Sequence, residues 1–171
     1  MPILPRTEVS ISAATPPESP QPIRLLVVED SRLDYELLLA TLAHDGLEVV
    51  GRRVEEREEL VRALAEAHWD AVISDHHLPR FSGTEALQVV RASGLILPFI
   101  IVSGLIGEEA AAAAMRNGAD DFLVKGRLAR LVPALLNALA TAEARREQLR
   151  TARQLGQSQQ RRRELLPHLD T

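Results

Sequence analysis

The sequence contains no cysteine, few aromatic residues and no hydrophobic run long enough to cross a membrane. Without cysteine the chain can form neither a disulfide framework nor a thiolate-ligated metal site, which suits a reducing compartment. Aromatic residues make up 3% of the chain, so leucine, valine, isoleucine and alanine must build most of the core. A membrane span needs roughly 18 apolar residues, and a secretory signal needs a basic region before an apolar one. We therefore expect a cytoplasmic protein with no membrane partner.

Length and charge narrow the class of protein further. A chain of 171 residues favours one folded domain with tails. The formal net charge of −4 offers no general basic surface for nucleic acid. The arginine-rich end of the chain is interspersed with glutamate, which indicates a solvated helix face. We therefore expect no nucleic-acid partner.

Composition divides the chain into three parts. Residues 1–22 contain six prolines with serine and threonine between them, a composition that buries too little apolar surface to fold. We interpret residues 1–22 as a disordered leader and residues 23–142 as the folded domain. Residues 143–171 should form a helical extension. It should fray near Gly156 and Ser158, and Arg161–Arg163 and Pro167 should be disordered.

Five apolar runs of strand length alternate with helical segments. The predicted strands are residues 24–28, 47–51, 70–75, 99–102 and 121–124. The first predicted helix follows Ser31, and we expect Leu33, Leu37, Leu38 and Leu42 to face inward. The others cover about residues 56–68, the segment after the capping box Ser82–Glu85, residues 107–117, and the segment from Arg127 or Leu128. This alternation predicts an α/β fold with a doubly wound five-stranded parallel sheet, helices on both faces and strand order 2-1-3-4-5.

Polar residues that could take part in chemistry lie at the ends of four of these strands. Glu29 and Asp30 follow the first strand, and Asp75 ends the third, where an open α/β sheet places its ligands. Three crowded carboxylates repel one another, and oxygen ligands suit Mg²⁺, which relieves that repulsion. Ser103 and Lys125 end the fourth and fifth strands. A carboxylate nucleophile with a cation, a lysine and a hydroxyl describes an aspartyl-phosphate site.

From about Ile23 to Asn137 the chain resembles the receiver domain of two-component response regulators. The matching residues are Glu29-Asp30, Asp75 within Asp-His-His-Leu-Pro, Ser103-Gly104 and Lys125. The resemblance implies a flavodoxin-like fold and phosphoryl transfer from a histidine kinase or phosphotransfer protein to Asp75. It also implies a downstream protein target, contacted through a surface that phosphorylation switches. The chain would then be a stand-alone phosphoacceptor switch rather than a turnover enzyme.

The resemblance also assigns residue roles. Asp30, Asp75 and the backbone carbonyl of His77 would hold Mg²⁺, and Glu29 would act through water. Ser103 would hydrogen-bond the phosphoryl group, and Lys125 would pair with it. Phe122 occupies the position of the switch aromatic coupled to Ser103. One departure is Gly126, where the family usually has proline after the lysine, so the sequence leaves open whether the Lys125–Gly126 bond is cis or trans.

Other functions and assemblies stay open at this stage. A haloacid-dehalogenase-like phosphatase also uses aspartate and magnesium, but it needs Asp-x-Asp after the first strand, where this chain has Glu29-Asp30-Ser31-Arg32. The sequence also leaves open that the chain is a receiver fragment of a larger hybrid signalling protein. The last helix is longer than the sheet needs, and Leu128, Leu135, Ala142 and Leu149 recur at heptad spacing, which predicts a helical homodimer contact.

Overall fold

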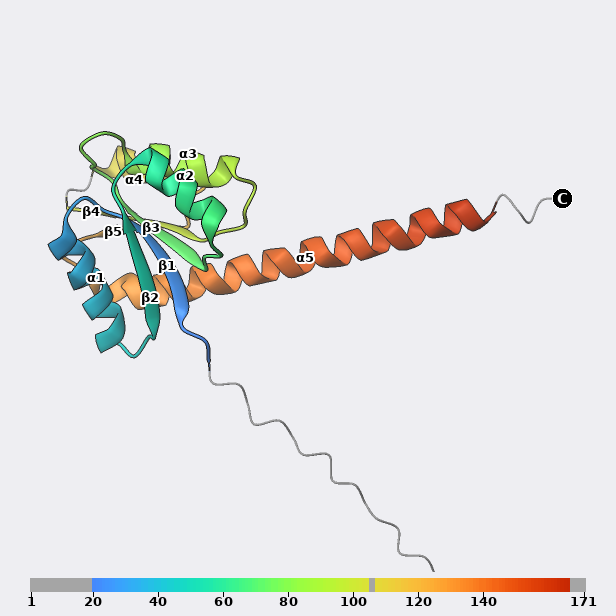
Figure 1. The fold of residues 1–171 in the computed structure, drawn as a ribbon, viewed down its shortest axis with the longest axis horizontal. Helices are drawn as coiled ribbons and strands as arrows, with labels where there is room; N and C mark the ends of the chain where they lie inside the picture. The colour runs from blue at the N-terminus through green and yellow to red at the C-terminus, as the bar shows by residue number, and fades with distance from the viewer. Residues whose placement is uncertain (1–19, 105–106, 167–171) are drawn as a thin grey trace, which may run out of the picture.

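The computed structural model describes residues 20–104 and 107–166, in which a parallel sheet is flanked by helices (Figure 1). The strands are β1 (Ile23–Val28), β2 (Val49–Val54), β3 (Ala71–Asp75), β4 (Phe99–Ser103) and β5 (Asp121–Val124). The helices are α1 (Arg32–His44), α2 (Arg57–Glu66), α3 (Gly83–Ala92), α4 (Glu108–Arg116) and α5 (Leu131–Leu165), with a 3₁₀ turn at Leu128–Arg130. Of the predicted leader, residues 1–19 lie outside the described ranges, and residues 20–22 are exposed.

The strand order β2-β1-β3-β4-β5 confirms the predicted topology. Every pair of neighbouring strands is parallel. β3 is buried at all five positions because it lies at the centre of the sheet and has helices over both faces. Such a strand carries the continuous apolar run that the sequence showed at Ala71–Ile73. The carboxyl ends of the strands consequently meet along one edge.

The helices form a layer on each face of the sheet. α1 and α5 cover one face, where Leu38 and Leu42 of α1 and Leu131 and Leu135 of α5 join the inward side chains of the strands. The helices α2, α3 and α4 cover the other face through residues such as Leu60, Leu87 and Ala114. Alternate residues of β1 divide between the two cores, as the two-residue period of a strand requires: Leu25 and Val27 point to one, and Leu26 and Val28 to the other.

The predictions for α1 and β2 were wrong in detail. Leu33 and Leu37 are 64% and 53% exposed, because the inner face of α1 follows the four-residue step from Leu38 to Leu42. β2 starts and ends later than predicted, because it pairs with β1 along its full length, from Ile23–Val49 to Val28–Val54. An edge strand tolerates the arginines within that stretch, since one side of it faces solvent.

The end of α2 also differs from the prediction, since the helix stops at Glu66 rather than His68. Ala67 turns into an extended conformation there. The indole N–H of buried Trp69 donates to the carbonyl of Ala63 over 2.8 Å, which satisfies one of the last carbonyls of the helix. The tryptophan therefore folds the chain back toward the sheet where the helical pattern of the sequence continued.

The last helix, α5, leaves the sheet and projects as a single rod (Figure 1). Leu131, Leu135, Ala138 and Ala142 are buried against the domain, and Arg146 donates to the carbonyl of Ile96 over 2.6 Å where the helix departs. The helix continues through Gly156 and Ser158 and includes Arg161–Arg163, where fraying and disorder were predicted. Pro167 lies outside the described residues. In the part of the chain that the structure describes, no helix has the length and apolarity of a membrane span.

Candidate functional site

The predicted site residues meet at the carboxyl edge of the sheet. Ser74 pairs with Val28, so Asp75 ends β3 beside the chain that leaves β1 as Glu29 and Asp30. On its other side Asp75 pairs with Val102 of β4, and the backbone N–H of Lys125 donates to the carbonyl of Ser103 over 2.8 Å. Parallel pairing therefore places all five residues along one edge, as the sequence predicted.

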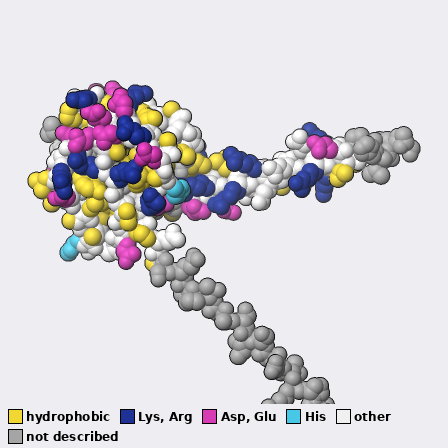
Figure 2. Space-filling model, viewed as in Figure 1, with side chains coloured by type: hydrophobic (Ala, Val, Ile, Leu, Met, Phe, Trp, Pro, Cys, Tyr) yellow, Lys and Arg dark blue, Asp and Glu magenta, His cyan; other side chains and the backbone are white. Residues whose placement is uncertain are grey.

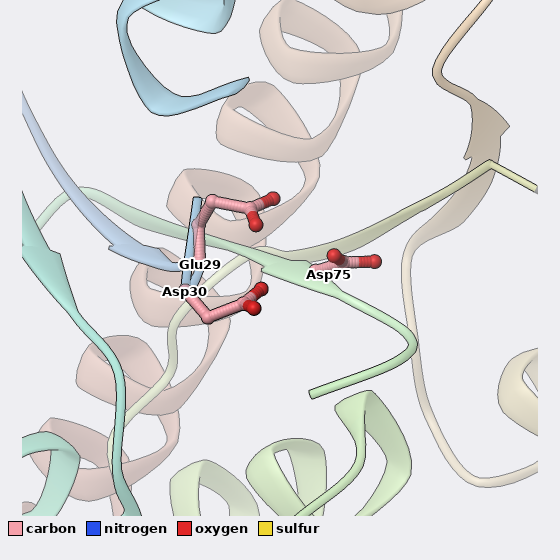
Figure 3. A group of neighbouring side chains, drawn as sticks. All are labelled: Glu29, Asp30 and Asp75. Atoms are coloured by element: carbon pink, nitrogen blue, oxygen red, sulfur yellow. The ribbon is translucent and has the colours of Figure 1, made fainter. Parts of the chain in front are cut away.

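Three carboxylates converge at this edge. Single oxygens of Glu29, Asp30 and Asp75 all lie within 4.8 Å of one another, and the three side chains approach the same space from β1 and β3 (Figure 3). Glu29 and Asp75 are buried, at 5% and 8% exposed, whereas Asp30 is exposed. Burial raises the pKa of Glu29 to about 7; the negative charge of Asp75 adds to this, and hydrogen bonds from Ser31 and Lys125 oppose it.

These residues fit a divalent cation. The ligand atoms are all oxygens, the type that Mg²⁺ and Ca²⁺ prefer, and they are close enough to share one ion. Burial is the main reason that the pKa of Glu29 lies near 7, and the negative charge of Asp75 raises it further. A bound cation would lower that pKa and favour the ionised carboxylates.

Lys125 supplies positive charge at the centre of the group. Its Nζ lies 3.0 Å from Oδ2 of Asp75, 3.1 Å from Oε2 of Glu29 and 2.6 Å from Oδ2 of Asp34. Burial disfavours the charged amine, but the hydrogen bonds to these three carboxylates outweigh it and raise the pKa of Lys125 above its ordinary range. Lys125 is also the only lysine in the 171 residues. The amine is therefore protonated at every physiological pH and already touches the central aspartate.

The sequence analysis missed two residues that contact the site, Asp34 and Arg53. The sequence analysis gave Asp34 no role in the site, although its position four residues after Asp30 could have indicated a fourth carboxylate. Arg53, at the end of β2, donates to the backbone carbonyls of Glu29 and Asp30 over 3.2 and 3.4 Å and also pairs with Glu55. Nothing in the local sequence marks Arg53 as a site residue, because the two carbonyls to which it donates lie more than twenty residues away.

The turn after Asp75 is held by close backbone contacts. The N–H of His77 donates to Oδ1 of Asp75 over 3.3 Å, and His77 bridges to Ser82 at the start of α3. Gly83 allows this approach, since a Cβ there would lie 2.7 Å from the carbonyl oxygen of Asp75. The metal role of the His77 carbonyl stays a prediction. The turn nevertheless places the His77 backbone beside the carboxylate that it would assist.

Ser103 and Phe122 lie on the far side of Asp75. Ser103 is fully buried at the end of β4, and Phe122 of β5 pairs with Ile101. The ring of Phe122 is half-buried and meets the ring of His76 edge-on at a centroid distance of 5.7 Å. The phosphoryl and switch roles predicted for Ser103 and Phe122 stay predictions. No peptide bond between described residues is cis, so the Lys125–Gly126 bond is trans.

A pocket adjoins the charged group on the α1 side. Glu29, Asp34, Asp75 and Lys125 line its polar part. Its apolar wall comes from the sheet, from α1 and from the turn before α5, with Ile73, Val102, Tyr35, Leu38 and Leu128 among the lining residues. An apolar wall lowers the local dielectric, so charges in this pocket interact more strongly than charges on an open surface.

Comparison with known families decides the class of the domain. The pattern described as the response regulator receiver domain matches residues 25–136. The chain belongs to this family. Receiver domains are phosphoacceptor signalling modules that generally bind Mg²⁺ at an acidic pocket and act with histidine kinases or phosphotransfer proteins and downstream effectors.

Relatives of known sequence place the receiver within longer proteins. Response regulator MprA of Mycolicibacterium vanbaalenii is 32% identical over 104 residues, which cover 61% of this chain and 44% of that protein. The sensory/regulatory protein RpfC of Xanthomonas campestris is 35% identical over 136 residues, which cover 75% of this chain and 18% of that protein. The chain thus spans less than half the length of these relatives.

Solved structures show the same receiver fold. A putative response regulator from Chloroflexus aurantiacus superposes with a TM-score of 0.63 at 29% identity, covering 70% of this chain and 99% of that one. The signal receiver domain of a putative LuxO repressor from Vibrio parahaemolyticus gives a TM-score of 0.65 at 23% identity, covering 73% and 95%. Both stop short of the full chain, which is consistent with α5 projecting beyond the receiver.

Proposed function

We propose that the chain is a cytoplasmic phosphorylation switch in which Asp75 accepts a phosphoryl group from a histidine kinase or phosphotransfer protein. A carboxylate oxygen of Asp75 forms a bond to phosphorus while the bond from phosphorus to the donor nitrogen breaks. The electron pair of that bond stays with the donor imidazole, which takes up a proton. The observation that carries this proposal is the 3.0 Å contact between Lys125 and buried Asp75 beside two further carboxylates.

The remaining site residues have roles that follow from charge and position. Asp30, Asp75 and the carbonyl of His77 would hold Mg²⁺, with Glu29 acting through water. When bound, the ion supplies positive charge that offsets the charge of the phosphoryl oxygens. Lys125 would pair with one phosphoryl oxygen, and the Ser103 hydroxyl would donate to another.

Labelling with a small phosphodonor tests the site. We expect radiolabelled acetyl phosphate with magnesium to give an acid-labile, hydroxylamine-sensitive label on the wild-type chain and none on Asp75→Asn. Glu85→Gln, which removes an exposed carboxylate in the first turn of α3, is the matched control and should label normally. A label of equal size on Asp75→Asn would overturn the assignment of the phosphoacceptor.

The enzyme alternative makes a different prediction. A haloacid-dehalogenase-like phosphatase would turn over added phosphomonoesters, but the segment after β1 lacks the Asp-x-Asp that this chemistry needs. We therefore expect no release of phosphate from an added phosphomonoester beyond the stoichiometry of the protein. The chain would act as a switch that is itself phosphorylated and does not hydrolyse other phosphate esters.

Signal output is proposed to occur through protein contacts. Its surface would lie around α4, β5 and α5, adjacent to Phe122. Whether the receiver works alone or as part of a hybrid protein sets which partner it contacts. The matched region makes up 18% of the sensory/regulatory protein RpfC, so a receiver like this one also occurs within a much longer chain.

A contact between two copies through α5 is proposed in a narrower form than the sequence suggested. Leu135 and Ala142 of the predicted seam are buried in their own domain, so a second copy would use the helix beyond them. There, one face carries Leu149, Ala152 and Leu155, and Leu149 and Leu155 are 45% and 60% exposed. Figure 2 shows arginine side chains along this projecting part.

Sedimentation tests this contact and its charge dependence. The segment from Glu143 to Leu166 contains seven arginines and three glutamates, so two such helices repel, and added salt should strengthen the dimer by screening that repulsion. Truncation after Ala142, or Leu149→Arg in the full chain, should give a monomer. An unchanged mass for either variant would contradict the contact.

A further inference from the structure

Asp34 is the carboxylate closest to Lys125, and no role in phosphoryl transfer has been assigned to it so far. Its Oδ2 lies 2.6 Å from the lysine Nζ, against 3.0 Å for Asp75 and 3.1 Å for Glu29. Asp34 belongs to the first turn of α1, whereas the other two carboxylates come from the ends of β1 and β3. The lysine is therefore held between the sheet and a helix.

A closed circuit of hydrogen bonds fixes Asp34 at this position. The N–H of Ser31 donates to Glu29 over 3.0 Å, and the Ser31 hydroxyl caps α1 by accepting from the N–H of Asp34 over 3.2 Å. Lys125 closes the circuit by donating to both Glu29 and Asp34. A carboxylate is favoured in the first turn of a helix, where the helix dipole is positive. The helix cap and the site lysine thus form one connected unit.

This circuit creates a competition once Asp75 is modified. A phosphoryl group on Asp75 brings additional negative charge to the place where the lysine already serves three carboxylates. The lysine can pair fully with the phosphoryl oxygens only if it loosens its hold on another partner. The side chain of Asp34 is the most exposed of the three, at 37% against 7% for the side chain of Glu29 and 8% for that of Asp75. Water therefore replaces the lysine at Asp34 at the lowest cost.

We propose that Asp34 is a positioning residue that holds Lys125 in the unphosphorylated domain and releases it to the phosphoryl group on Asp75. This inference rests on the proposed function, because it assumes that Asp75 is the phosphoacceptor. Asp34 is then an anion that opposes the entry of an anionic phosphodonor and stabilises the resting arrangement of the site.

The half-saturating concentration of phosphodonor tests this role. In Asp34→Asn, one negative charge leaves the pocket and the lysine is free to meet the donor. We expect the acetyl phosphate concentration for half-maximal labelling to fall by about threefold to tenfold, as expected for a charge removed a few ångströms away. Asp34→Glu should restore the wild-type value. Glu36 is an exposed carboxylate of the same helix that pairs with Arg32 and not with Lys125. Glu36→Gln should therefore leave the half-saturating concentration unchanged.

Selective lysine labelling gives a second measurement, because the chain has a single lysine. In the wild type, beryllium fluoride with magnesium, which imitates the phosphoryl group, should shift the side-chain NMR signal of Lys125. In Asp34→Asn the free protein should already give a displaced signal, whereas Glu36→Gln should give the wild-type signal. A merely structural Asp34 would alter stability but neither this signal nor the half-saturating concentration.

The outcomes separate this inference from the function beneath it. If wild type and Asp75→Asn label equally, the phosphoacceptor assignment fails and the role of Asp34 fails with it. If labelling is lost in Asp75→Asn, but Asp34→Asn and Glu36→Gln share one half-saturating concentration and one lysine signal, only the role of Asp34 is overturned.

Discussion

Replacing Lys125 by glutamine should destabilise the domain and make its stability strongly dependent on magnesium. The ammonium group contacts Asp34, Asp75 and Glu29, and two of these carboxylates are more than nine-tenths buried. Glutamine keeps most of the length of the side chain but removes the charge. The buried carboxylates would then lie close together without a cation, which raises the free energy of the folded state.

The size of the effect follows from the burial of the partners. Removing one member of a buried ion pair costs about 3–5 kcal/mol, and partial exposure of Lys125 and Asp34, at 27% and 37%, lowers this. We expect the free energy of unfolding at pH 8 without divalent ions to fall by about 2–3 kcal/mol. For a domain of this size the thermal midpoint should drop by about 5–10 °C.

The loss should be smaller at pH 6. The pKa of Glu29 is about 7 in the folded protein, so at pH 6 this carboxyl is mostly protonated and one of the unpaired charges disappears. At pH 8 Glu29 is ionised and the repulsion is at its largest. The difference between wild type and Lys125→Gln therefore grows as the pH rises through 7.

Urea unfolding followed by Trp69 fluorescence measures this effect. Trp69 is the only tryptophan and is 4% exposed in the receiver core, so its signal reports on the domain rather than on the projecting helix. Millimolar magnesium should recover part of the lost stability, because the ion replaces the missing positive charge. Arg127→Gln removes an exposed cation two residues away as the control. Equal stability of Lys125→Gln and wild type at pH 8, or an equal loss at both pH values, would refute this reasoning.

Three further predictions concern other parts of the site. The pKa of Glu29 is raised from 4.5 in the unfolded chain to about 7 in the folded protein. The stability that the protonated carboxyl contributes is therefore fully present below pH 4.5 and is lost as the pH rises through 7. Glu29→Gln should remove this dependence on pH from the free energy of unfolding measured in urea. Arg53→Ala should weaken magnesium binding severalfold by calorimetry, since it frees the carbonyls of Glu29 and Asp30. Gly83→Ala should lower stability by about 1–3 kcal/mol and reduce labelling, because its Cβ would press on the Asp75 backbone.

Each of these predictions has its own control. Arg53→Lys, which retains a cation and a donor, should recover part of the magnesium affinity. Gly94→Ala introduces a methyl group into open space at a positive φ, so it should reduce stability without reducing labelling. A pH slope that survives in Glu29→Gln, unchanged affinity in Arg53→Ala, or full labelling by Gly83→Ala would each contradict the corresponding account.

Most of the sheet and the positions of the strand-end residues could be predicted from the sequence. The apolar runs ending in Asp75, Ser103 and Lys125 are short, buried and separated by helical segments, so local pattern and parallel topology together place their ends at one edge. The strand order was equally predictable, because right-handed crossovers leave few alternatives.

Other features depend on contacts between distant segments and could not be predicted from the local sequence pattern. The face of α1 that is buried contains Leu38 and not Leu33, because the helix packs on the sheet with that side. The several leucines of the segment could have formed more than one apolar face. The end of α2 depends on the indole of Trp69, and the contact of Asp34 with Lys125 joins residues 91 apart. The continuation of α5 past Gly156 likewise could not be predicted, because a glycine in a helix lowers its stability without ending it.

Chemical mapping of the phosphoryl group is the most direct measurement of the central claim. The protein is treated with acetyl phosphate and magnesium, reduced with borohydride, and sequenced by mass spectrometry of its peptides. Reduction converts an aspartyl phosphate to homoserine, so our account predicts homoserine at residue 75 and aspartate unchanged at residues 30 and 34. Homoserine at residue 30 or 34 instead, or at none of the three residues, would contradict our account.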